Sequence, residues 1–123
     1  MAKARVLVID DDKTILDILK LALQNAGFEV LPAIDGNIGL KIFREQKPEL
    51  AIVDIAMPGV DGYQVIEEIK KASEGQSAKV VILTAHEQSV MRAYADELGV
   101  DLYLTKPITP SQLIEHLNAL LEK

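Results

Sequence analysis

Cysteine is absent from the 123 residues of this chain. Its absence excludes disulfide bonds, thiolate zinc sites and cysteine nucleophiles, and it suits a protein kept in a reducing cytosol. Histidine is nearly as scarce, because the chain has only His86 and His116, far apart in sequence. We therefore expect no histidine-built metal site, and we interpret His116 as a surface residue of a helix.

Long apolar runs and an excess of positive charge are also missing. No apolar stretch approaches the roughly 20 residues that a membrane-spanning helix needs, and the first residues, MAKARVLVID, lack the cleavage site of a secretory signal. The formal net charge is −6, whereas nucleic-acid binding depends on lysine and arginine that neutralise phosphates. We expect a cytoplasmic protein without direct contact to nucleic acid or membrane.

What is present is the composition of one globular domain. Hydrophobic residues make up 49% of the chain and charged residues 26%, close to the average for soluble domains. The length falls within the commonest range for a single domain. Because we find no repeat, linker or low-complexity segment, we expect one domain over residues 1–123.

Short apolar runs alternate five times with amphipathic stretches. Strands are predicted at residues 5–9, 28–33, 50–54, 79–83 and 101–104, and helices at 14–26, 36–46, 61–71, 88–98 and from 109 onward. Strands separated by helices need crossover connections, which place helices on both faces of a parallel sheet. The sequence thus predicts an α/β domain with a doubly wound, five-stranded parallel sheet.

Several residues refine this pattern. Pro32 predicts that the second strand lies at the edge of the sheet, because proline cannot donate a ladder hydrogen bond. Asp12 and Thr109 are predicted to cap the first and last helices, the latter with Pro110 at its first position. The apolar stripe of the first helix consists of Ile15, Ile18, Leu19, Ala22 and Ala26.

Polar side chains gather where the predicted strands end. Open α/β sheets bind ligands beyond the carboxyl ends of their strands, and these ends carry Asp10, Asp11, Asp54, Thr84, Thr105 and Lys106. Thr84 by itself could be an ordinary strand-end hydroxyl, and Lys106 a surface lysine. Together they predict a site, because crowded carboxylates repel one another unless a cation lies among them.

The most unusual of these residues is Asp54, a carboxylate set in the apolar stretch LAIVDI. A carboxylate removed from water is costly unless it is paired or coordinated. Acids at this edge could bind Mg²⁺, which takes one or two protein carboxylates, while a lysine and a threonine hold phosphoryl oxygens. Phosphoryl transfer relies on such positioning, and an aspartate can serve as its nucleophile.

Four segments, VLVIDDD, AIVDIAMPGVDG, VVILTA and YLTKPI, occur in this order along the chain. With them the sequence resembles the receiver domain of bacterial two-component response regulators, of the chemotaxis-regulator-like, flavodoxin-like (βα)5 kind. The resemblance covers essentially the whole chain and implies the strand order 2-1-3-4-5, with strands numbered along the chain. It also implies that a sensor histidine kinase or phosphotransfer protein phosphorylates Asp54.

The resemblance further implies a role for each matching residue. Mg²⁺ would be bound by Asp11 directly, by Asp10 mainly through water, by Asp54 and by the backbone carbonyl of Ala56. Thr84 and Lys106 would hold the phosphoryl group, and Tyr103 would be the aromatic switch that turns inward when Asp54 is phosphorylated. A cis peptide bond between Lys106 and Pro107 and a changed surface on helix four, strand five and helix five are implied as well. The downstream protein target or output domain cannot be read from the sequence.

Two other readings of the same residues compete with this one. Asp10, Asp12 and Thr14 spell D-x-D-x-T after an apolar strand, as in haloacid-dehalogenase-type phosphohydrolases, where Asp10 would be the nucleophile. That reading leaves Asp54 unexplained and lacks a cap segment. A flavodoxin-type binding module would need hydroxyls and amides in the first loop, where three aspartates would repel a phosphate.

Overall fold

The computed structural model describes residues 4–55, 62–72, 78–85 and 89–122. Its strands are β1 (Arg5–Ile9), β2 (Glu29–Ala33), β3 (Leu50–Val53), β4 (Lys79–Thr84) and β5 (Leu102–Thr105). Its helices are α1 (Lys13–Asn25), α2 (Gly36–Gln46), α3 (Gly62–Ala72), α4 (Ser89–Glu97) and α5 (Pro110–Leu121). All ten predicted elements are present, with ends that differ by at most one residue from the predicted ones.

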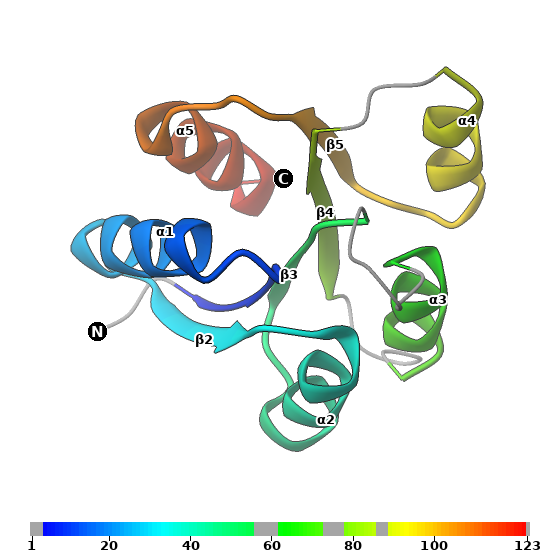
Figure 1. Cartoon of the computed structure of the whole chain (residues 1–123), viewed down its shortest axis with the longest axis horizontal. Coiled ribbons are helices and arrows are strands. Elements are labelled where there is room, and N and C mark those ends of the chain that lie inside the picture. The colour runs from blue at the N-terminus through cyan, green and yellow to red at the C-terminus, as the bar shows by residue number, and fades with distance from the viewer. Residues whose placement is uncertain (1–3, 56–61, 73–77, 86–88, 123) are drawn as a thin grey trace.

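The five strands form one parallel sheet in the order β2-β1-β3-β4-β5 (Figure 1). This confirms the predicted α/β class and strand order. Strand β2 lies at one edge, where Pro32 is paired with Val8 of β1. The edge position accounts for a proline in a strand, because its missing N–H costs no hydrogen bond to a further strand.

Helices cover both faces of the sheet (Figure 1). Side chains alternate between the faces along each strand, so that Val6 and Val8 of β1 join the core beneath α1 and α5. Leu7 and Ile9 point the other way, into the core beneath α2, α3 and α4. Among the described residues, no helix is long and apolar enough to cross a membrane.

The predicted helix caps are confirmed. The side chain of Asp12 accepts hydrogen bonds from the backbone N–H groups of Thr14 and Ile15 at the start of α1. At the start of α5, Thr109 and Gln112 form a reciprocal capping box, followed by Pro110 at the first helical position. These caps satisfy amide groups that a helix leaves without partners in its first turn.

The predicted apolar stripe of α1 is partly wrong. The helix buries Leu16, Leu19 and Leu23, whereas Ile18 is 52% exposed. Spacing by three and four residues allowed either stripe, because α1 carries apolar residues over more than half of its circumference. Which of the two stripes is buried depends on the angle at which the sheet and α5 meet the helix. The spacing of apolar residues along the sequence does not give this angle.

Helix α2 packs closely on β1 through Gly39. A Cβ atom at this position would overlap the Cδ1 atom of Ile9, and both residues are buried. Glycine is therefore favoured here by the close approach of the helix to the sheet, since overpacking forces neighbouring side chains out of their preferred rotamers.

We predict that Gly39→Ala lowers the free energy of unfolding by about 1 kcal/mol, measured by urea denaturation. Alanine favours a helix by up to ~1 kcal/mol over glycine, but the overlap with Ile9 costs roughly 1–3 kcal/mol. In an Ile9→Val background, which lacks Cδ1, the loss should shrink. An equal loss in both backgrounds would show that Ile9 is not the cause.

Candidate functional site

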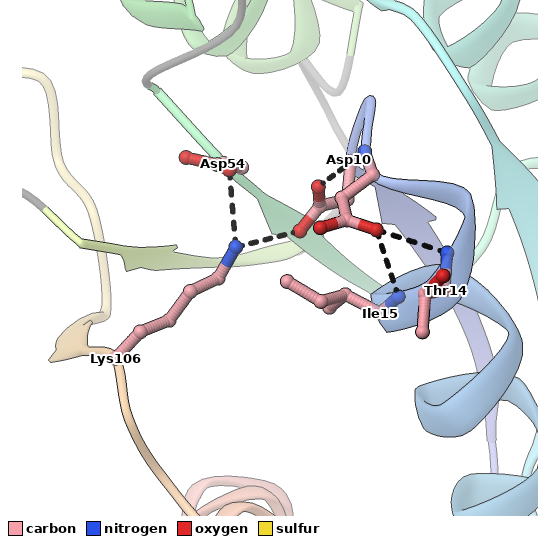
Figure 2. A network of polar contacts seen from close by, with 6 residues as sticks. Asp10, Thr14, Ile15, Asp54 and Lys106 are labelled. Carbon is pink, nitrogen blue, oxygen red and sulfur yellow. Dashed lines mark hydrogen bonds and ion pairs between the residues drawn. The ribbon is translucent and has the colours of Figure 1, made fainter.

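The carboxyl ends of β1, β3 and β5 bring three charged residues together. Asp10 directly follows β1 and Asp54 directly follows β3. The two strands are neighbours in register, and the N–H of Asp54 donates to the carbonyl oxygen of Ile9 at 3.0 Å. Lys106 follows β5 and extends its side chain across β4 toward both aspartates (Figure 2).

The ammonium group of Lys106 bridges the two aspartates. Its Nζ atom lies 2.9 Å from Oδ2 of Asp10 and 3.1 Å from Oδ2 of Asp54. Asp10 is 2% exposed and Asp54 6%, so both carboxylates are largely removed from water. The lysine supplies the partner that a charge at the end of an apolar strand requires.

The two aspartates also change the acidity of the lysine. Burial is the largest single influence on the pKa of Lys106 and would lower it, but the hydrogen bonds and negative charges of Asp10 and Asp54 together outweigh burial. The pKa of Lys106 is therefore raised above its ordinary value of 10.5. The group is a cation throughout the physiological range.

Both oxygens of Asp10 have protein partners. Oδ2 accepts from Lys106, and Oδ1 accepts from the backbone N–H of Asp12 at 2.9 Å. The carboxylate of Asp12 is itself engaged in capping α1, through Thr14 and Ile15 (Figure 2). The D-x-D-x-T residues thus form the turn and cap that lead into α1, which speaks against a phosphohydrolase with Asp10 as nucleophile.

Three carboxylates could hold a divalent cation. One oxygen from each of Asp10, Asp11 and Asp54 can be chosen so that all three lie within 4.8 Å of one another. Asp11 is exposed, whereas the other two are buried. Hard carboxylate oxygens are the ligands that Mg²⁺ prefers, and Mg²⁺ usually keeps several waters, which an exposed ligand allows. The donor set therefore fits this ion.

The other predicted site residues lie on β4 and β5. Thr84, the last residue of β4, is fully buried and is paired in register with Thr105. The N–H of Lys106 donates to the carbonyl oxygen of Thr84 at 2.8 Å, so the two predicted phosphoryl-binding residues are tied through their backbones. Tyr103 is buried against the α2, α3 and α4 face of the sheet.

Two further predictions are confirmed, and a third concerns a residue that the structure does not describe. The peptide bond between Lys106 and Pro107 is cis, as predicted, and His116 is exposed on α5, also as predicted. The backbone carbonyl of Ala56, predicted to complete the metal shell, lies outside the described residues, as does His86.

Sequence reasoning did not anticipate how the charges pair. It assigned Lys106 to the phosphoryl group and a metal to the acids, whereas the lysine contacts both buried acids directly. The contacts span 96 and 52 residues of sequence, and no spacing rule relates positions so far apart. One feature of the sequence could have indicated this pairing. Several acids but only one lysine follow the predicted strands at this edge of the sheet.

We predict that Lys106→Met tightens Mg²⁺ binding about tenfold, because removal of a positive charge a few ångströms from the acids is worth at least ~1 kcal/mol. It should also lower the free energy of unfolding by about 1–3 kcal/mol without Mg²⁺, because two buried acids lose their partner. Titration calorimetry and urea denaturation measure the two effects. Lys71→Met on α3, whose side chain is 74% exposed, is the matched control. An Mg²⁺ affinity equal to that of the control would contradict the prediction.

The same pair of proteins tests the raised pKa of Lys106. A pKa that is higher in the folded than in the unfolded state stabilises the fold fully below the unfolded value of about 10.4, and this stabilisation is lost as the pH rises through the folded pKa. The stability advantage of the natural protein over Lys106→Met should therefore be constant near neutral pH and fall above about pH 10.4. An advantage that grows in this range would contradict the assigned direction.

The chain matches the family model of the response regulator receiver domain over residues 6–118. It is similar to the receiver domain protein (CheY-like) from Methanospirillum hungatei JF-1, with 30% identity, a TM-score of 0.90, and coverage of 96% of this chain and 93% of that one. A receiver domain protein from Clostridium thermocellum is 36% identical, with a TM-score of 0.87 and coverage of 97% and 94%.

NtrX from Brucella abortus is 30% identical with a TM-score of 0.88, and the match covers 99% of this chain but 27% of NtrX. The same fold thus occurs both in chains of this length and as one part of a longer protein. The family match, the strand order and the acidic pocket beside Lys106 agree with one another, and on this evidence the chain belongs to the response regulator receiver domain family.

Proposed function

We propose that this protein is a phosphorylation-dependent switch that accepts a phosphoryl group on Asp54 from a sensor histidine kinase or a phosphotransfer protein. The observation that carries the proposal is the Lys106 ammonium group within 3.1 Å of Asp54, beside a carboxylate cluster that fits Mg²⁺. A nucleophilic carboxylate, a cation for phosphoryl oxygens and a metal site lie together at one sheet edge. This is the arrangement that phosphoryl transfer needs.

In the proposed reaction a carboxylate oxygen of Asp54 attacks the phosphorus of a phosphohistidine donor. The new P–O bond forms as the P–N bond breaks, and the electron pair of the P–N bond remains on the imidazole nitrogen, which is protonated from solvent. The product is an acyl phosphate. Lys106 would turn from the carboxylate oxygen of Asp54 to a phosphoryl oxygen, so its charge stays paired throughout.

Asp10, Asp11 and Asp54 would hold Mg²⁺, and Ala56 would add its backbone carbonyl. When bound, the ion neutralises the negative charge that the acids and the phosphoryl oxygens would otherwise concentrate. Lys106 holds Asp10 by one oxygen and Asp12 holds it by the other. Asp10 is therefore fixed in place and would contact the ion mainly through water, while the exposed Asp11 would bind it directly.

The switch would run through β4 and β5. Thr84 and Lys106 would both hold the phosphoryl group, and the backbone hydrogen bond between them joins the ends of these strands. Tyr103 lies on β5 opposite Ile82 and is buried here. Phosphorylation would favour this inward position of the ring. Inversion of a population ratio from 1:99 to 99:1 needs about 5.5 kcal/mol, which a new charge-assisted contact, a hydroxyl bond and a metal contact could supply together.

We propose that residues 1–123 act as one receiver domain in the cytoplasm, as the family resemblance implies. The protein would catalyse only its own phosphorylation and dephosphorylation rather than turn over a separate substrate. Its output would be a changed surface on α4, β5 and α5, read by a protein target or an output domain and not by nucleic acid or membrane directly.

We predict that acetyl phosphate with Mg²⁺ adds one phosphoryl group to the natural protein, measured by mass spectrometry of the intact chain. Asp54→Asn should abolish the added mass because the amide is no nucleophile, and Asp11→Ala should slow its appearance by about tenfold or more because the metal loses a direct ligand.

Asp12→Asn is the matched control, because asparagine caps a helix as well as aspartate does and the variant removes a charge beside the site. It should accept phosphate normally. Full phosphorylation of Asp54→Asn would defeat the assignment of the acceptor.

A further inference from the structure

Helix α3 presents one stripe of side chains to α4 and to the segment that joins α4 to β5. The stripe consists of Tyr63, Glu67 and Lys70, spaced by four and three residues and therefore on one face of the helix. Each member has a partner between residues 94 and 101, and α3 and α4 lie next to each other on the same face of the sheet (Figure 1).

The first two residues of the stripe, Tyr63 and Glu67, each contact Tyr94 of α4. The rings of Tyr63 and Tyr94 lie 5.0 Å apart between centroids and are tilted by 60°, a separation and tilt that attract aromatic rings. The hydroxyl of Tyr94 donates to Oε1 of Glu67 at 2.9 Å. Tyr63 is buried, whereas Tyr94 is 39% exposed, so the contact lies at the surface end of the helix pair.

The last residue of the stripe, Lys70, contacts the end of the segment that joins α4 to β5. Nζ of Lys70 lies 3.7 Å from Oδ2 of Asp101, and the same oxygen accepts from the N–H of Val80 at 2.8 Å. Gly99, with a φ of +81°, turns the chain beside the aliphatic part of Lys70. The contacts of Asp101 join the start of β5 to β4 and α3. They provide a fixed point about which α4 could move.

The first residue of α3, Gly62, packs against the backbone just beyond the end of β3. A Cβ atom at Gly62 would overlap the backbone Cα of Ile55, the residue that directly follows Asp54. Tyr63 comes next in α3. A displacement of the backbone at Asp54 and Ile55 is therefore transmitted to α3 at the residue adjoining its contact with α4, because close-packed backbones leave no space to absorb it.

We propose that Tyr94, held by Tyr63 and Glu67, is a latch that keeps α4 on α3 and so sets how much phosphorylation is needed to change the α4 surface. The inference rests on the proposed function for its consequence, although the latch itself exists without phosphate. Movement of α4 away from α3 breaks the Tyr94 to Glu67 hydrogen bond. The latch therefore favours the arrangement described here over a displaced one.

The test is Tyr94→Phe, which keeps the ring and removes the hydroxyl. Loss of one hydrogen bond should speed amide hydrogen exchange at Leu98 and Val100, whose N–H groups bond to the carbonyls of Tyr94 and Ala95, by about three- to tenfold without any phosphodonor. Beryllium fluoride, which mimics a phosphoryl group on a carboxylate, should bind more tightly by a similar factor, because coupling between two sites is reciprocal.

Two further variants sharpen the test. Glu67→Ala removes the acceptor and should reproduce Tyr94→Phe, and the double variant should add nothing further. Glu45→Ala removes the same charge from the exposed side of α2 and should leave amide exchange at Leu98 and Val100 and the affinity for beryllium fluoride unchanged.

Natural exchange rates at Leu98 and Val100 in Tyr94→Phe would overturn the latch. Faster exchange with an unchanged affinity for beryllium fluoride would overturn its coupling to the acceptor site. A natural protein that binds no beryllium fluoride would instead defeat the proposed function, and the exchange measurement would still decide whether the latch exists.

Discussion

Among the described residues, one ammonium group balances the charge of two buried carboxylates at the carboxyl edge of the sheet. Lys106 lies between Asp10 and Asp54 at 2.9 and 3.1 Å, and it gives two buried carboxylates an oppositely charged partner. Carboxylates so far removed from water are costly without such a partner. The contact that stabilises this edge is thus also the one that sets a cation beside Asp54.

The parallel sheet is the reason why so few residues suffice. All five strands end at the same edge, so one residue at the end of each of β1, β3, β4 and β5 supplies an acid, a second acid, a hydroxyl and an ammonium group. The remaining parts of the same loops serve the fold. Asp12 caps α1, and the cis peptide bond after Lys106 precedes the capping box of α5. Residues of the candidate site and structural residues lie within two or three positions of one another.

Helix α4 is held by surface contacts as well as by the core. Helices α1 and α5 share a continuous apolar core with β1, β3, β4 and β5. On the other face, α4 contributes the buried Ala95 to a second apolar core, and its described contacts also include a tyrosine pair and a hydrogen bond at its exposed side. Polar surface contacts of this kind contribute little net stability and can be exchanged at small cost. An element that changes position in the proposed switch would be well served by them.

The sequence alone determined the architecture. Five apolar runs, five amphipathic stretches and the edge proline Pro32 define a doubly wound parallel sheet, because hydrophobic period and turn chemistry act locally. It also predicted which residues would lie at the carboxyl edge, since every strand of a parallel sheet ends at the same edge. Asp10, Asp54, Thr84 and Lys106 all lie there. The caps at Asp12 and Thr109 were likewise local and predictable.

Only the tertiary structure decided which charges pair and which helix faces are buried. Three features depend on distances between segments far apart in the chain. They are the contact of Lys106 with Asp10 and Asp54, the burial of Leu16 rather than Ile18 on α1, and the hydrogen bond from Tyr94 to Glu67. Such contacts follow from how helices and strands pack against one another. Packing is the result of many weak interactions summed over the whole core, which no local pattern of residues contains.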